Sequence, residues 1–115
     1  MNQPSRISHP FIALEYSLTA IQKLKRPIEE LARKDPDLTR QIRRAASSVA
    51  QNLGEGCRRA GKDRTYHYRV AAGSAEETRV SLLVAVAWGY LASDDLAEPL
   101  RLFDRILAIL HSLTR

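Results

Sequence analysis

The chain has little of several residues that would indicate other classes of protein. A single cysteine, Cys57, excludes an internal disulfide and favours a reducing compartment, so we expect a cytoplasmic protein. Five glycines and five prolines are too few for a repetitive or linker-rich chain. The longest uncharged apolar run, residues 80–93, is too short to span a bilayer, so we expect no membrane partner. The three histidines lack metal-binding spacing, so we expect no metal and no other cofactor.

Helix-forming residues and helical periodicity dominate the 115-residue chain. We expect an all-α fold with a disordered arm over residues 1–9 and one domain over residues 10–115. The predicted helices span about residues 10–34, 36–58, 63–88 and 95–113. Because their connections are short, successive helices should run antiparallel, as in an up-down-up-down four-helix bundle.

Four residues indicate where these helices begin or end. Asp35 followed by proline is typical of an N-cap with proline in the first turn. Asp63 and Asp94 are the predicted N-caps of the third and fourth helices. Gly89 predicts a C-terminal stop, because glycine readily adopts the left-handed conformation that ends many helices.

The last two helices carry more apolar surface than one bundle needs. In the third helix, one stripe contains Tyr66, Val70, Val84 and Trp88, and the opposite stripe contains Ala71, Ala75, Leu82 and Val86. A helix that is apolar nearly all round should be buried on both sides, so we expect self-association. The alternative is a scatter of exposed apolar side chains, which is ordinary. The interface is assigned to Leu82, Val86, Leu102, Ile106, Ile109 and Leu113.

The net charge of +5 comes from one region of the chain. Residues 40–69 hold eight basic and two acidic side chains, and the basic ones are mostly arginine, which suits bidentate phosphate contacts. Tyr66, His67 or Tyr68 could add base stacking. The alternative is an ordinary solvated charged surface. The candidate nucleic-acid contacts are Arg40, Arg43, Arg44, Arg58, Arg59, Lys62 and Arg64.

Three polar residues, Asn52, Glu55 and Glu77, fall near apolar stripes. They could form a buried network that fixes helix register, or serve in acid–base catalysis. We favour the network, because no nucleophile–base pair accompanies them. Residues 56–63 resemble a phosphate-binding loop, but the last position is aspartate instead of serine or threonine, and the loop follows a helix. We therefore expect no enzyme activity.

Three motifs carry a resemblance to a known family. They are Arg-Arg-Ala-Ala-x-Ser-Val-x-x-Asn-Leu-x-Glu-Gly from residue 43, Gly-Ser-Ala-x-Glu from residue 73, and Gly-Tyr-Leu from residue 89. Over residues 10–113 the chain resembles the bacterial four-helix-bundle proteins encoded in intervening sequences of large-subunit ribosomal RNA genes. A looser resemblance connects it to the accessory bundle of diversity-generating retroelements. These resemblances imply a ring-shaped homopentamer and a connection to RNA.

The sequence therefore favours a non-enzymatic, oligomeric bundle that binds RNA or structured nucleic acid through its arginines. The alternative is an adaptor or assembly scaffold for a protein partner such as a reverse transcriptase.

Overall fold

The computed structural model describes the backbone of residues 4–115 and the side chains of residues 10–115, and every regular element within that range is helical. The elements are α1 (Pro4–Ala32), α2 (Pro36–Arg58), α3 (Gly61–Ala87), the short 3₁₀ helix η1 (Ser93–Leu96) and α4 (Ala97–Leu113). The expected all-α fold with four main helices is thus confirmed.

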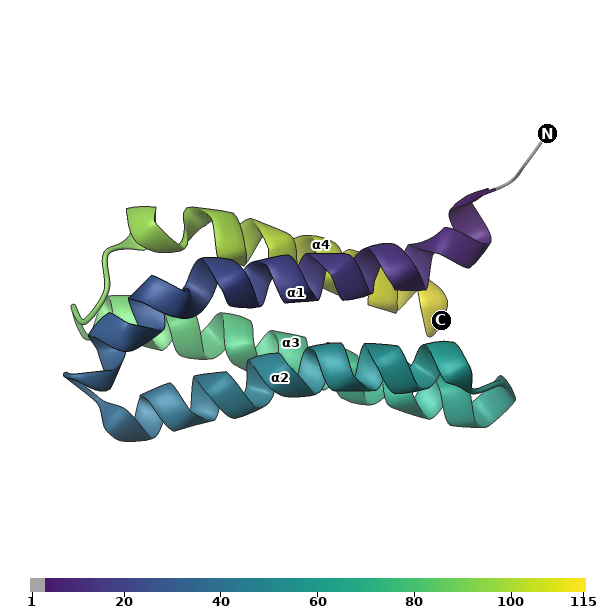
Figure 1. The fold of residues 1–115 in the computed structure, drawn as a ribbon, viewed down its shortest axis with the longest axis horizontal. Helices are drawn as coiled ribbons and strands as arrows, with labels where there is room; N and C mark the ends of the chain where they lie inside the picture. Colours follow the sequence, from purple (N-terminus) through teal and green to yellow (C-terminus); the bar gives the residue numbers. More distant parts are fainter. Residues whose placement is uncertain (1–3) are drawn as a thin grey trace.

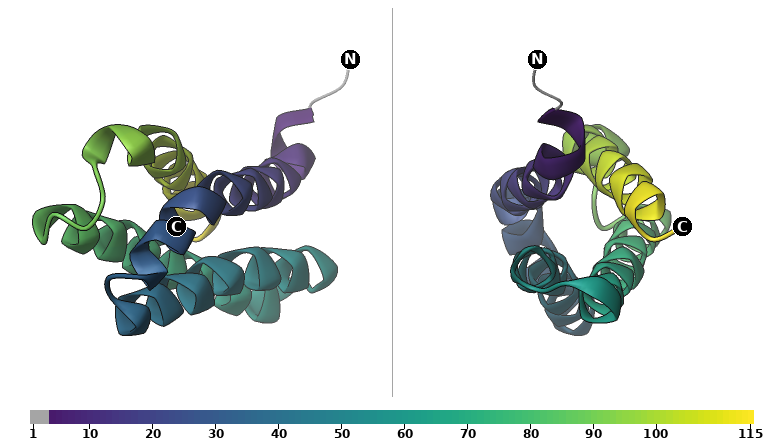
Figure 2. Two further views of the ribbon diagram at one scale, coloured as in Figure 1. Left: turned by 60° about the vertical axis from the view of Figure 1, so that its left-hand side comes forward. Right: turned by 90° about the vertical axis from the view of Figure 1, so that its right-hand side faces the viewer.

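The connections of the bundle lie at two opposite ends (Figure 1). The turn between α1 and α2 and the loop between α3 and α4 share one end, whereas the turn between α2 and α3 lies at the other, near the C-terminus. Helix α1 packs against α2 and α4, and α3 packs against the same two helices. Viewed from the end with the α2–α3 turn, the four helices surround a central core (right panel of Figure 2). The largest core side chains include Leu31, Ile42, Leu53, Leu82, Phe103, Ile106 and Leu110, all fully buried.

Helix α2 has the bounds that its sequence indicates. The Asp35 carboxylate accepts a hydrogen bond of 3.0 Å from the backbone N–H of Leu38, which confirms its role as N-cap. The apolar stripe of this helix, which includes Ile42, Val49 and Leu53, is completely buried. The opposite side of α2 is left to charged and polar residues.

Other helix ends differ from the sequence-based prediction. Helix α1 begins at Pro4, so residues 4–9 of the predicted disordered arm are helical; residues 1–3 lie outside the described residues. Helix α3 begins at Gly61, with Ala60 in the N-cap position instead of Asp63. Gly61 has a φ of +60°, so the tight turn itself sets where α3 begins.

The end of α3 and the start of α4 give one confirmation and one correction. Gly89 has a φ of +79°, and the backbone N–H of Tyr90 reaches back to the carbonyl of Ala85 at 2.9 Å, as in a Schellman motif. Asp94, in contrast, does not cap α4, because it lies within the 3₁₀ turn that precedes the helix.

The interface assigned to the last two helices needs correction. Leu82 and Ile106 are fully buried within the single chain, because the stripe that carries Leu82 is the one that α3 turns toward the core. They are therefore unavailable to a second subunit. Val86, Leu102, Ile109 and Leu113 are half-buried and pack against the same core. The outward side of α3 instead exposes a different apolar set, Val80, Leu83, Val84 and Trp88, which we call the α3 apolar stripe.

Candidate nucleic-acid interface

The exposed arginines of α2 form two groups instead of one continuous patch. Arg40, Arg43 and Arg44 project from the first half of the helix, and Arg58 projects from its last turn. At a rise of about 1.5 Å per residue, Arg44 and Arg58 are separated by roughly 21 Å along the axis. Arg40 is paired with Asp37 one turn earlier. The arginines of α2 are therefore not equivalent, because Arg40 is already paired with a carboxylate.

The two ends of the bundle differ in charge. Around the α2–α3 turn, residues 54–70 carry more basic than acidic side chains; the basic ones are Arg58, Arg59, Lys62, Arg64 and Arg69, against Glu55 and Asp63. At the opposite end, which holds the α1–α2 turn and the loop between α3 and α4 (Figure 1), the balance is reversed. Residues 30–40 and 93–96 carry more acidic than basic side chains: Glu30, Asp35, Asp37, Asp94 and Asp95 against Arg33, Lys34 and Arg40. We call the first end the basic end and the second the acidic end.

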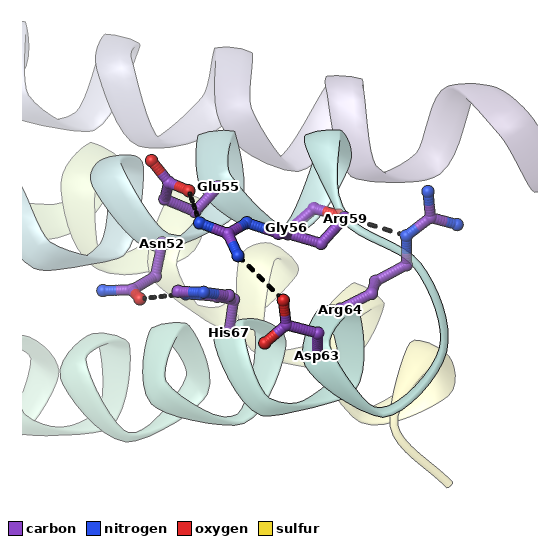
Figure 3. Close-up of polar contacts among 7 residues, drawn as sticks. All are labelled: Asn52, Glu55, Gly56, Arg59, Asp63, Arg64 and His67. Atoms are coloured by element: carbon purple, nitrogen blue, oxygen red, sulfur yellow. Dashed lines mark hydrogen bonds and ion pairs between the residues drawn. The ribbon is translucent and has the colours of Figure 1, made fainter.

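Arg59 is held by two carboxylates at the basic end (Figure 3). Its guanidinium lies 3.1 Å from Glu55 and 2.8 Å from Asp63, so it links the end of α2 to the first turn of α3. The hydrogen bond to Asp63, followed by the one to Glu55, raises the pKa of Arg59. Because two negative charges already surround this side chain, Arg59 serves to hold the turn and is a poor candidate for phosphate contact.

Arg64 has a mixed role. Its Nε donates a hydrogen bond of 3.1 Å to the carbonyl of Gly56, a carbonyl near the end of α2. The terminal nitrogens of its guanidinium point away from this contact (Figure 3). The Nε of Arg64 therefore satisfies a carbonyl near the end of α2, while the terminal nitrogens of its guanidinium face outward. Arg58, Lys62 and Arg69 are also exposed at this end.

A chain of hydrogen bonds joins α2 to α3 behind the basic end. The Oδ1 of Asn52 lies 2.9 Å from Nδ1 of His67, and its Nδ2 donates to the carbonyl and hydroxyl of Ser48. The Ser74 hydroxyl donates to that of Ser48 at 2.8 Å. Because the amide oxygen can only accept, Nδ1 of His67 must carry the proton. This chain fixes the register of the two helices.

The predicted polar trio is thus only partly assembled. Asn52 belongs to the network, Glu55 instead pairs with Arg59, and Glu77 is exposed on α3. Within residues 10–115, Glu77 forms no side-chain hydrogen bond or ion pair. Sequence reasoning missed Ser48, Ser74 and His67 as members of the network. The available signal was their spacing: Ser48 lies one turn before Asn52, and Ser74 lies two turns after His67.

The three adjacent ring-bearing residues of α3 have different environments. Tyr68 is buried, and its hydroxyl lies 3.9 Å from the Cys57 sulfur. Burial, with the contact to Cys57, raises the pKa of Tyr68 to about 12. His67 is held by Asn52, whereas Tyr66 is 61% exposed. Of these rings, the Tyr66 ring has by far the most open surface for stacking.

The described residues offer limited chemistry beyond charge. They contain no group of three or more His, Cys, Asp or Glu side chains that could hold a metal ion. Nor does any helix in the described part of the chain have the length and apolar character needed to cross a membrane. What the basic end presents is a set of outward cations beside one exposed aromatic ring, and such a surface suits binding of polyanions.

Comparison with known proteins identifies the family. Searches of curated proteins and of solved structures gave no match. A family model does match, over residues 14–112, which is most of the chain, and its description is "23S rRNA-intervening sequence protein". The chain therefore belongs to the 23S rRNA-intervening sequence protein family.

Proposed function

We propose that this protein is a non-enzymatic, cytoplasmic RNA-binding bundle that contacts RNA or other structured nucleic acid through its basic end. In this proposal the helices follow an up-down-up-down order, and several chains assemble into a ring-like oligomer. The observation that carries it is the cluster of outward cations, Arg58, Lys62 and Arg64, around the α2–α3 turn. The family description, which refers to ribosomal RNA, adds support.

Pairing with neighbouring carboxylates makes some basic residues better candidates for the proposed interface than others. Arg44 is exposed on the same side of α2 as Arg58, roughly 21 Å away along the helix axis. Arg40 and Arg59 are less suitable, because each is paired with a neighbouring carboxylate. Arg43 lines a groove of about 340 Å³ between α1 and α2, beside Glu29. We expect binding to depend on the backbone and the shape of the RNA, because no residue of this interface specifies a base sequence.

A salt titration tests the proposal. Filter binding of a structured RNA hairpin would be measured at several salt concentrations for the wild type and for the triple variant Arg44→Ala, Arg58→Ala, Lys62→Ala. Each lost phosphate contact should lower the log–log salt slope by ~0.7–0.9, so the triple variant should bind more weakly and with a slope smaller by roughly 2–3.

The matched control removes the same charge elsewhere. Arg26, Arg101 and Arg105 are exposed on α1 and α4, and their combined replacement by alanine should leave the salt slope within experimental error of the wild type. Equal losses in both triple variants would mean that only net charge matters. Failure of the wild type to bind any nucleic acid at low salt would refute the proposal.

The α3 apolar stripe supports a second candidate function, contact with a protein. Val80, Leu83 and Val84 are 44%, 43% and 37% exposed, and Trp88 is 70% exposed. These residues recur every three or four positions, so they form one outward surface. We propose that a second subunit covers this stripe; an adaptor role, with a partner such as a reverse transcriptase, would use the same surface.

A further inference from the structure

An open hollow of about 630 Å³ lies on the outward side of α3 at the basic end. It is lined by Gly61, Lys62, Thr65, Tyr66 and Arg69. Positions 62, 65, 66 and 69 have the spacing of a single helix face, so their side chains surround the same stretch of surface. The hollow therefore combines one aromatic ring with two cations, and its lining contains no carboxylate.

The Tyr66 ring contacts the ring of the next residue. It meets the ring of His67 edge to face, with 5.2 Å between the ring centroids. His67 in turn is fixed by Asn52 and, through Asn52, by Ser48. A ring that is held in place loses little conformational entropy when a planar group stacks against it. The network that joins α2 to α3 thus orients an exposed aromatic surface.

The cations are placed on both sides of this ring. Lys62 lies one turn before Tyr66, and Arg69 lies about one turn after it; both are exposed. They are separated by roughly 10 Å along the helix axis. Asp63, the nearest carboxylate in the sequence, is already paired with Arg59. A ligand that fits would have a flat face at its centre and negative charge on both sides.

We propose that this hollow binds an unpaired nucleotide of RNA, with its base stacked on Tyr66 and its flanking phosphates at Lys62 and Arg69. A base in the interior of a duplex has both faces covered by its neighbours, whereas an unpaired base can stack on the exposed ring. This inference rests on the proposed RNA-binding function and specifies which part of the RNA is recognised.

Two RNA probes and two variants of Tyr66 test the inference. The probes are a uridine oligonucleotide without secondary structure and a blunt RNA duplex of equal length. Tyr66→Ala should weaken binding of the single strand roughly 5- to 100-fold at fixed salt, the range expected for one lost stacking contact. Its salt slope should stay unchanged, because no cation is removed. Tyr66→Phe should bind like the wild type, and Tyr66→Ala should bind the duplex like the wild type.

Other outcomes separate this inference from the function on which it rests. If the wild type binds RNA but Tyr66→Ala binds the single strand equally well, the nucleotide site is refuted while the RNA-binding function stands. Competition by polyglutamate as strong as competition by the uridine oligonucleotide would also refute stacking, since it would identify a plain anion site. If the wild type binds neither probe, the proposed function fails and the nucleotide site fails with it.

Discussion

The ring of Tyr68 on α3 occupies the space that a side chain at Gly56 on α2 would need. A Cβ atom built at Gly56 would lie 2.6 Å from Cδ1 of that ring, closer than real Cβ contacts. The two helices therefore approach closely at the basic end only because residue 56 is glycine, and this contact places Arg58, Arg64 and the turn between them.

Replacing Gly56 by alanine should destabilise the fold by about 1–3 kcal/mol, because the buried Tyr68 ring must move. Gly54 provides the control, since a Cβ atom there meets nothing within 4 Å. Gly54→Ala should stabilise α2 by about 0.5–1 kcal/mol through helix propensity. Urea unfolding of both variants measures the difference. Equal effects of the two substitutions would show that the helices do not approach as described.

The hydrogen-bonded chain between α2 and α3 predicts a cost for removing Asn52. Asn52→Leu leaves the Nδ1–H of His67 without its acceptor, and an unpaired polar group in such a place costs about 1–3 kcal/mol. Glu77→Leu is the control: this side chain is exposed, so the change in unfolding free energy should stay within about 0.5 kcal/mol. Thermal and urea unfolding would decide, and equal losses would place Glu77 back in the network.

Tyr68 predicts a loss of stability at high pH. Its pKa is raised to about 12 in the folded protein, against 10.0 for the ordinary side chain. The folded state therefore keeps the phenol proton more tightly than the unfolded state. This contribution is fully present below pH 10 and is lost as the pH rises through 12, and it amounts to at most about 2–3 kcal/mol.

Comparison with Tyr68→Phe isolates this effect from the titration of other groups. Guanidinium unfolding at intervals from pH 9 to pH 12 should show a steeper decline for the wild type than for the variant. Parallel curves would mean that the Tyr68 hydroxyl ionises as freely in the fold as in water.

The α3 apolar stripe predicts the oligomeric state. At micromolar concentration, sedimentation equilibrium should give a mass several times the chain mass of 12.9 kDa. The double variant Leu83→Glu, Val84→Glu should dissociate while it retains its helical circular dichroism, because both residues are exposed in the single chain. Leu82→Glu should instead unfold, since Leu82 is fully buried. A wild type that sediments as a monomer would rule out self-association through this stripe.

Sequence reasoning located the elements well wherever a local signal was strong. The N-cap at Asp35 and the stop at Gly89 depend on nearby backbone geometry, which short motifs encode directly. At the start of α3 the same reasoning selected Asp63, but that carboxylate is occupied by Arg59. A sequence window cannot reveal this competition, because it arises only after the α2–α3 turn brings the two residues together.

The choice of interface stripe on α3 could not be made from the sequence. Both sides of the helix are apolar, so periodicity does not distinguish the side that faces the core from the side that faces outward. Leu82 proved to be a core residue, whereas Val84 and Trp88 proved to be exposed. The same limit applies to the arginines, which look equivalent in the sequence. In the structure Arg59 pairs with two carboxylates, whereas within residues 10–115 no carboxylate pairs with Arg58.

The difference in charge between the basic end and the acidic end makes the chain an electric dipole along its long axis (Figure 1). In the field of a polyanion such a molecule turns with the α2–α3 turn foremost before any contact forms. A larger fraction of encounters then has the productive orientation, so the association rate rises, most strongly at low ionic strength. The arrangement of the turns thus governs how fast a partner is found, separately from how tightly it is held.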